Sequence, residues 1–222
     1  MPNIYVNHNY FSSQNENMAY IMGFLAADGN ISKRDNRIQS QLSIKDKEQL
    51  ELFHNEIGGC EVYIYQSNGY DCCGWHCFSG QIKRDLAEYG IIPNKTGHLE
   101  IPKKLNKEYW RDFIRGYFDG DGSIYEDKTG IRLTITSANK EILDDINSYF
   151  KINGIKPSNL YNDHNNKDIR FRTQASIDIY TLLYYPNCLC LNRKKKKFLE
   201  LIKKRYNSTR LRNFPAEVEE IC

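Results

Sequence analysis

Two aspartates in matching surroundings are the residues of this sequence best suited to chemistry. Asp28 closes the apolar stretch 20–29 (YIMGFLAADG), and Asp121 closes the stretch 113–122 (FIRGYFDGDG). Each stretch predicts a helix that stops at Asp-Gly. A carboxylate at a helix C-terminus meets the negative end of the helix dipole, and a second carboxylate beside it adds repulsion. If the two helix ends meet, the pair therefore favours a bound cation.

The small residues inside these helices give a reason for the ends to meet. Gly23 and Gly116 stand at matching positions, where a glycine costs about 1 kcal/mol relative to alanine. Gly23 and Ala27, like Gly116 and Gly120, stand four residues apart and share one helix face. Such faces let two helices touch backbone to backbone. We therefore expect the helices to pack closely, with the two aspartates side by side.

Oxygen atoms would hold the cation at these helix ends. We expect the carboxylates of Asp28 and Asp121 and the main-chain carbonyls of Ala27 and Gly120 to face it. Hard oxygen ligands, in a site open to water and substrate, suit Mg²⁺ better than zinc. The sequence therefore predicts a magnesium site.

The two stretches resemble the paired motifs of the LAGLIDADG homing endonucleases, in the single-chain form that carries both copies. One position departs from the pattern, because an earlier motif aspartate is Asp119 in the second copy but Ala26 in the first. In the resembling family that position is not the essential ligand, so activity is still expected. The resemblance places the helix-packing glycine on Gly23 and Gly116, the metal-binding acid on Asp28 and Asp121, and the closing glycine on Gly29 and Gly122.

The resemblance implies a monomer that makes a metal-dependent, staggered double-strand cut in a long asymmetric DNA target. Each motif acid would serve the scissile phosphate of one strand. Mg²⁺ is the expected cofactor, Mn²⁺ a substitute, and Ca²⁺ is expected to support binding without cleavage. The coding sequence is expected to lie in an intron and not in an intein. The sequence begins with Met1 and ends at Cys222 without the terminal residues that protein self-splicing needs.

An internal duplication organises the rest of the chain. An offset of 93 positions takes Asp28 to Asp121 and aligns the strand and helix patterns that follow. These patterns predict the order helix, strand, strand, helix, strand, strand, helix in each half. We expect an α+β protein of two pseudo-symmetric αββαββα halves, residues 1–105 and 106–222, each with an antiparallel DNA-binding sheet and joined by the two motif helices.

Each predicted sheet has one polar face. Glutamine can pair with adenine, and arginine with guanine, in the major groove of DNA. On strand composition alone a solvated outer face is an equal alternative, and the metal site favours the DNA interpretation. The residues expected to contact DNA are Arg37, Gln39, Gln41, Ser43, Lys45, Tyr63 and Tyr65 in the first half, and Arg132, Thr134, Thr136, Arg170 and Arg172 in the second.

Lysines are expected beside the metal site. A cation there would stabilise the charge that the scissile phosphate gains in the transition state, or order the attacking water. The resemblance implies one such catalytic lysine from each half, by position Lys95 and Lys194, with Lys45 as a further candidate. The alternative for Lys194 is a phosphate-facing charge run, 194–197, which together with 203–205 concentrates positive charge near the C-terminus.

A cysteine and histidine cluster, Cys72, Cys73, His76 and Cys77, invites a zinc interpretation. We give it little weight, because the paired Cys-x₂-Cys knuckle is missing and the run predicts a strand, which points neighbours to opposite faces. The seven cysteines, in a chain without a secretion signal, are expected to be free thiols.

Two further questions are the cellular location of the protein and the functions that compete with DNA cleavage. It has no apolar run of membrane-spanning length and no signal-peptide core, so we expect an intracellular protein, in a bacterial or phage-infected cytoplasm or an organelle. Two rivals use the same scaffold: a maturase that binds its intron RNA, and a DNA-binding regulator without cleavage. Loss of a motif acid would favour either rival, and both acids are present.

Overall fold

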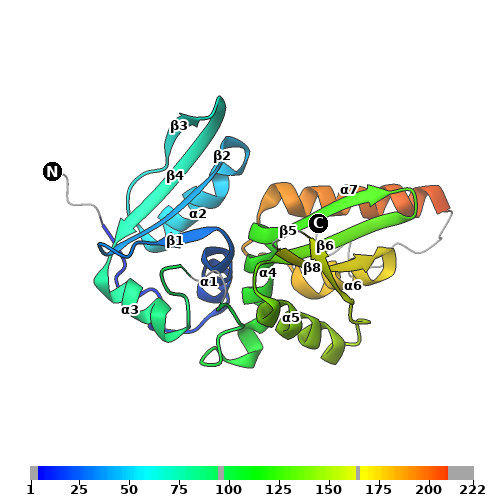
Figure 1. Ribbon diagram of the computed structural model, residues 1–222. Coiled ribbons are helices and arrows are strands. Elements are labelled where there is room, and N and C mark those ends of the chain that lie inside the picture. Colours follow the sequence, from blue (N-terminus) through cyan, green and yellow to red (C-terminus); the bar gives the residue numbers. More distant parts are fainter. Residues whose placement is uncertain (1–4, 95–97, 164–165, 210–222) are drawn as a thin grey trace.

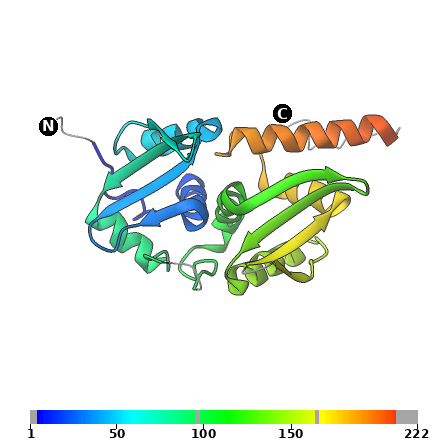
Figure 2. The same ribbon diagram turned by 45° about the horizontal axis from the view of Figure 1, so that its top comes forward.

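The centre of the fold is the pair of helices that carry the two acidic stretches. α1 (Glu16–Asp28) and α4 (Trp110–Asp121) pack against each other and lie between two sheets (Figures 1 and 2). Asn15 begins α1, because its side chain accepts a hydrogen bond from the backbone N–H of Met18 at 2.8 Å. The computed structural model describes residues 5–94, 98–163 and 166–209.

The two halves follow the same order of elements. The first half continues with β1 (Gly29–Ile31), β2 (Arg37–Ser43), the short 3-10 helix η1 (Ile44–Asp46), α2 (Lys47–Ile57), β3 (Tyr63–Ser67), β4 (Tyr70–Phe78) and α3 (Gly80–Glu88). The second half has η2 (Lys107–Tyr109) before α4, then β5 (Gly122–Asp127), β6 (Gly130–Ser137), α5 (Lys140–Ile152), β7 (Leu160–Asp163), β8 (Asn166–Arg172), α6 (Thr173–Leu183) and α7 (Asn192–Thr209).

Both sheets are antiparallel and have the same strand order. The first is β1-β2-β4-β3 and the second is β5-β6-β8-β7, so the hairpin that follows each motif helix pairs with the next hairpin of its own half. The prediction of two αββαββα halves joined through the motif helices is confirmed. α7 is an added element, and the expected boundary between residues 105 and 106 lies in the connection between α3 and α4.

The core explains which face of each sheet remains open. Trp75 of β4 packs edge-on against Phe53 of α2, with ring centroids 5.5 Å apart, and Phe53 packs in the same way against Phe24 of α1 at 5.4 Å. In the second half Phe171 of β8 packs against Phe150 of α5 at 5.5 Å. Helices therefore cover one face of each sheet, and the polar strand residues lie on the other face.

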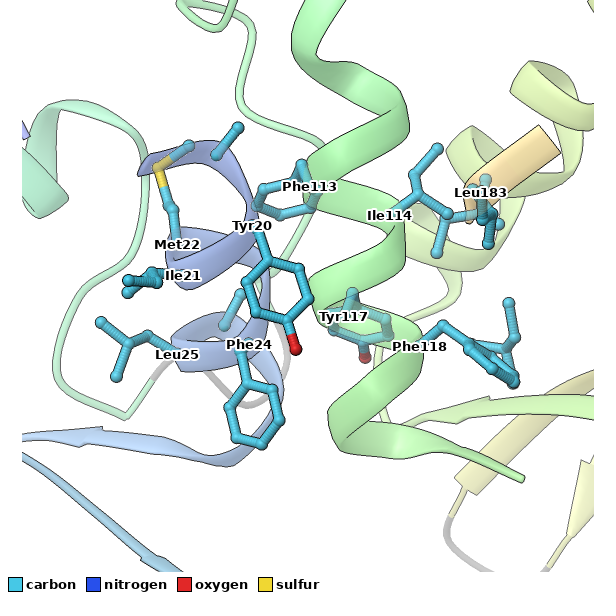
Figure 3. Packing of buried hydrophobic residues seen from close by; sticks show 14 of the residues in the cluster. Tyr20, Ile21, Met22, Phe24, Leu25, Phe113, Ile114, Tyr117, Phe118 and Leu183 are labelled. Atoms are coloured by element: carbon cyan, nitrogen blue, oxygen red, sulfur yellow. The ribbon is translucent and has the colours of Figure 1, made fainter. Parts of the chain in front are cut away.

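Aromatic and aliphatic side chains fill the space around the two central helices. Figure 3 shows Tyr20 and Phe24 of α1 beside Phe113 and Tyr117 of α4, all of them buried. Burial of such large side chains contributes about 1.5–3 kcal/mol each. The two halves therefore share one continuous core through α1 and α4.

The glycines that end the motif helices are required for a different reason than a left-handed turn. Gly29 and Gly122 cap α1 and α4 in extended conformations, with φ of −82° and −87°. A Cβ on Gly29 would lie 2.5 Å from the carbonyl oxygen of Leu25, and one on Gly122 would lie 2.1 Å from a ring carbon of Phe118. The chain turns back so tightly over the last helical turn that a side chain has no space.

Within the described residues, no helix is long and apolar enough to cross a membrane.

Candidate active site and nucleic-acid interface

The closest approach between α1 and α4 occurs at their glycines. A Cβ built on Gly23 would lie 2.0 Å from the carbonyl oxygen of Phe113, and one on Gly116 would lie 2.0 Å from that of Tyr20. These neighbours are backbone atoms, which no change of rotamer can move away. The contact continues to the C-terminal ends, where a Cβ on Gly120 would lie 2.4 Å from the Cβ of Ala27. The helix ends are therefore in direct contact.

This contact brings together the two helix ends that carry Asp28 and Asp121. Asp28 is exposed and Asp121 is half-buried, and a Cβ on Gly120 would lie 3.4 Å from the Oδ2 atom of Asp28. The buried hydroxyl of Tyr117 donates to the Oγ atom of Ser137 at 2.9 Å. Burial and then the negative charges of Asp121 and Asp28 raise the pKa of Tyr117. Both carboxylates thus act on one phenol, which stays protonated.

A separate cavity lies beside each acid. Asp28 lines one of about 200 Å³, together with Gly122 and Lys194 of the second half. Asp121 lines one of about 240 Å³, together with Ala27 of the first half and Tyr117. Each acid therefore faces residues from the opposite half, which follows from the crossing of the two helices.

The donors at these helix ends fit a hard divalent ion. Asp28 and Asp121 supply carboxylate oxygens that water can reach, and Gly120 leaves the space beside Asp28 free of a side chain. Across the described ranges no group of three or more His, Cys, Asp or Glu side chains is placed to hold a metal. Further ligands would therefore be the carbonyl oxygens of Ala27 and Gly120, water or a phosphate.

Lys194 lies beside the motif acids, lining the cavity of Asp28, but its ammonium group is turned inward. It is only 6% exposed, and its ammonium group donates to the carbonyl oxygens of Phe118, Asp119 and Gly122 at 2.7, 2.7 and 2.6 Å. These three bonds use all three of its N–H groups. Burial lowers the pKa of Lys194 to about 8, while the charge of Asp119 opposes the shift. Lys194 therefore caps the C-terminus of α4 beside the two motif acids, and does not present its N–H groups to a phosphate.

Asp119, the aspartate that the first half lacks, is a buried junction that the sequence alone did not reveal. It accepts hydrogen bonds from the hydroxyls of Tyr20 at 2.9 Å and Tyr184 at 2.6 Å, and from the backbone N–H of Leu191 at 2.7 Å. Burial raises its pKa, and Lys194 is the largest opposing influence. Asp119 thus ties α1, α4 and the segment that leads into α7. Its mismatch with Ala26 was the signal in the sequence.

α7 also reaches across to the first half. Arg193 makes a bidentate ion pair with Asp46 of η1, at 2.6 and 2.8 Å, and Asn192 donates to Glu48 at 3.0 Å. Lys45, another candidate base, is exposed in η1 and lines a cavity of about 440 Å³ between α2 and α7. Sequence reasoning missed the ion pair, because its partners are far apart in the chain.

The remaining basic residues lie in several places. Lys95 falls outside the described residues. Leu99 is described, and it lines the cavity of Asp121. α7 lies beside β5 (Figure 2), and Lys204 pairs with Glu126 of that strand at 2.5 Å. The run 194–197 thus divides, because its first lysine is buried and Lys196 and Lys197 are exposed.

The open face of the first sheet carries the residues expected there. In the strand register Gln39 lies opposite His76 and Gln41 opposite Gly74, which in turn lies opposite Tyr63. Arg37, Ser43 and Tyr65 occupy further positions of this face. Cys72 and His76 lie on it as well, whereas Cys73 and Cys77 are buried on the other face. The four residues of the zinc interpretation are therefore not brought together.

The open face of the second sheet is richer in charge. Arg132 lies opposite Arg172 and pairs with Asp127 at 2.8 Å. Arg170 lies opposite Thr134 and makes two hydrogen bonds, of 2.8 and 2.9 Å, to the buried Asp168, which lies opposite Thr136. Arg170 also lies over the ring of Tyr161 at 4.8 Å. The arginines are therefore on one face, and two of them are held in place by aspartates.

Comparisons with known proteins agree with this geometry. Residues 108–203 match the family model of the LAGLIDADG-like domain. The fold is similar to that of the meganuclease I-SmaMI bound to an uncleaved DNA target in the presence of calcium ions, with a TM-score of 0.59 at 14% identity over 94% of this chain and 97% of that one. The second half of the chain therefore matches a LAGLIDADG-like domain, and the fold of the whole chain is similar to that of a meganuclease. At this identity the likeness shows the fold alone.

Two other proteins are similar to this chain, one in its fold and one in its sequence. Full-length DUF199/WhiA from Thermatoga maritima has a TM-score of 0.55 at 16% identity, over 89% of this chain and 64% of that one. The DNA-directed RNA polymerase subunit Rpo1C of Methanocaldococcus jannaschii is 30% identical over 128 residues, which are 57% of this chain and 15% of that subunit. The match therefore spans a small part of that relative.

Proposed function

We propose that this chain is a LAGLIDADG protein and a metal-dependent, site-specific endonuclease that cuts both strands of a long asymmetric DNA target. The observation that carries the proposal is the backbone contact between α1 and α4, which sets Asp28 and Asp121 together between two open sheet faces. Duplex DNA lying along both sheets would present its backbone to this junction. A divalent ion bound there would polarise the scissile phosphate and lower the pKa of a water molecule.

The chain itself supplies position and charge for this reaction. Asp28 and Asp121 hold negative charge at the helix ends, and the cap made by Lys194 offsets the negative end of the α4 dipole beside Asp121. Lys194 is therefore a positioning residue in this proposal. The open sheets would fix the register of the DNA through base contacts, while exposed lysines of α7 contact phosphates.

A cleavage assay tests the proposal directly. The protein is incubated with Mg²⁺ and a plasmid library of random sites, and the resulting ends are sequenced. We expect one family of related sites, cut on both strands with a stagger. Binding without any cut in Mg²⁺ or Mn²⁺ would favour a DNA-binding regulator, and retention of structured intron RNA in place of duplex DNA would favour a maturase.

Substitution of each motif acid tests the site. Asp28→Asn and Asp121→Asn keep the shape of the side chain but remove its charge, so cleavage should fall strongly on both strands while binding in Ca²⁺ survives. Asp144→Asn is the matched control, since Asp144 is an exposed acid of α5 paired with Lys140. Full double-strand cleavage by either motif variant would refute the proposed active site.

A further inference from the structure

The open face of the first sheet carries a continuous row of rings that lies outside the proposed active site. The aromatic row consists of Tyr65 and Tyr63 of β3 and His76 and Phe78 of β4. Neighbouring ring centroids are 5.9, 5.9 and 5.5 Å apart along it. Tyr63 is 38% exposed and Phe78 is 53% exposed. A sheet face that opens to solvent thus presents an apolar strip.

The surrounding residues hold this row in place. Gly74 lies opposite Tyr63, and a Cβ on it would lie 2.5 Å from the Cζ atom of that ring. Tyr63 can therefore lie flat across the strand only because residue 74 is glycine. The Sγ atom of Cys60 lies 3.3 Å from the Nδ1 atom of His76, and burial and then Arg37 lower the pKa of His76. The row is thus uncharged at neutral pH.

The packing of the rings limits what they can bind. Tyr63 meets His76 at 64° and His76 meets Phe78 at 82°, so the rings already pack edge to face. A base has no slot to enter between them. The row instead offers a smooth apolar surface of ring edges and faces, which suits small apolar groups. In the major groove of DNA the apolar group is the C5-methyl of thymine.

Polar neighbours on the same face complete the chemistry. Gln39 lies opposite His76, and Gln41 lies opposite Gly74, so two amides flank the row. An amide can pair with N6 and N7 of adenine, which is the partner of thymine. The second sheet presents Arg132, Arg170 and Arg172 at its corresponding strands, and arginine pairs best with guanine. The first sheet has a single arginine among these positions, Arg37 opposite Phe78, so the two open faces differ in their balance of rings, amides and arginines.

We propose that the aromatic row makes the first sheet a reader of thymine methyl groups, so that the half of the target under this sheet is rich in A·T pairs. The inference rests on the proposed function only in requiring that both sheets lie along duplex DNA. Specificity in this half comes from apolar contact with the methyl groups and from amide contact with the adenines. It does not depend on cleavage.

Deoxyuridine in place of thymidine tests the inference, because it removes the methyl group and keeps the base pair. A random duplex pool is selected for binding in Ca²⁺, and the selected duplex is then remade with deoxyuridine in one half at a time. We expect binding to weaken roughly ten-fold for one half, which is about the effect of a single poorly matched base pair. The other half should change much less.

Two variants assign the effect to the row. Phe78→Ala should remove most of the difference between thymidine and deoxyuridine. Tyr125→Ala is the matched control, an aromatic residue of the other open face that is 42% exposed, and it should keep the difference.

Each outcome of the deoxyuridine measurement decides the matter, even if the Phe78 variant fails to fold. Equal affinity for thymidine and deoxyuridine duplexes would overturn the inference and leave the proposed function intact. Failure to bind any duplex would overturn both. The same pool is also offered as single strands. Stronger binding to these single strands than to the duplexes, abolished in Phe78→Ala, would overturn the inference and mean that the row stacks on unpaired bases.

Discussion

The contact between Gly116 and Tyr20 allows a worked prediction for Gly116→Ala. The new methyl group would lie 2.0 Å from a backbone oxygen, whereas a carbon and an oxygen in contact need more than about 3 Å. Because backbone cannot yield by changing rotamer, the helices must separate by roughly 1 Å. Overpacking of this kind costs about 3 kcal/mol, the upper part of its range. Helix propensity returns about 1 kcal/mol.

The expected net loss of unfolding free energy for Gly116→Ala is therefore about 2 kcal/mol, which for a chain of this length lowers Tm by about 4–8 °C. Urea and thermal unfolding followed by circular dichroism measure it. Gly80→Ala is the matched control, since its Cβ would meet the side-chain nitrogen of Asn36 at 3.3 Å, which can move away. Equal stability of the two variants would refute backbone contact between α1 and α4. Cleavage should fall with Gly116→Ala even below its Tm, because the acids move apart.

Four further predictions concern the site and the interface. Lys194→Met should lower stability by about 1–3 kcal/mol by leaving carbonyls unpaired. The pKa of Lys194 is about 8 in the folded chain and 10.5 in the unfolded chain, so between these values the unfolded chain binds more protons. The contribution of Lys194 to the unfolding free energy therefore rises with pH in this range. Lys194→Met should lack that rise in urea titrations from about pH 7 to 10. Asp119→Asn should cost about 1–3 kcal/mol in the same assay, and a value equal to that of Asp144→Asn would contradict the junction described. Arg170→Ala should reduce discrimination at a few base pairs by roughly 1–3 kcal/mol in binding competitions. It should also lower the unfolding free energy, because Asp168 loses its partner. Arg172→Ala should reduce discrimination without lowering the unfolding free energy. Replacing Lys196, Lys197 and Lys203 by Gln should flatten the plot of log K against log salt by about 0.9 for each phosphate that these lysines neutralise, and an unchanged slope would place their side chains away from DNA.

The sequence predicted the scaffold because repetition made weak signals strong. Glycines at matching positions of both apolar stretches indicated a helix pair, and alternation along residues 37–44 separated the buried face of a strand from its polar face. The duplication then carried each assignment of the first half to the second. Strand and helix order followed from local patterns, which depend on neighbours in the chain.

Tertiary contacts were harder to predict, since they depend on residues far apart in sequence. Nothing near Lys194 indicates that its amine reaches back to Phe118, Asp119 and Gly122. The family resemblance predicted a lysine beside the acids and the charge run offered an exposed side chain as the alternative, whereas the first turn of α7 turns this lysine inward onto main-chain carbonyls. The aromatic row was equally hard to predict, because it depends on Gly74 lying opposite Tyr63 on a neighbouring strand.

The position of α7 has a consequence for the stage of synthesis at which the candidate site is completed. Every described element of both halves leaves the ribosome before α7, yet α7 delivers both Lys194 beneath α4 and Arg193 against Asp46 of the first half. A nascent chain that lacks this helix has its two acids but not the cap beside one of them. α7 therefore completes the candidate site, and a partly translated chain that lacks this helix would carry an unfinished one.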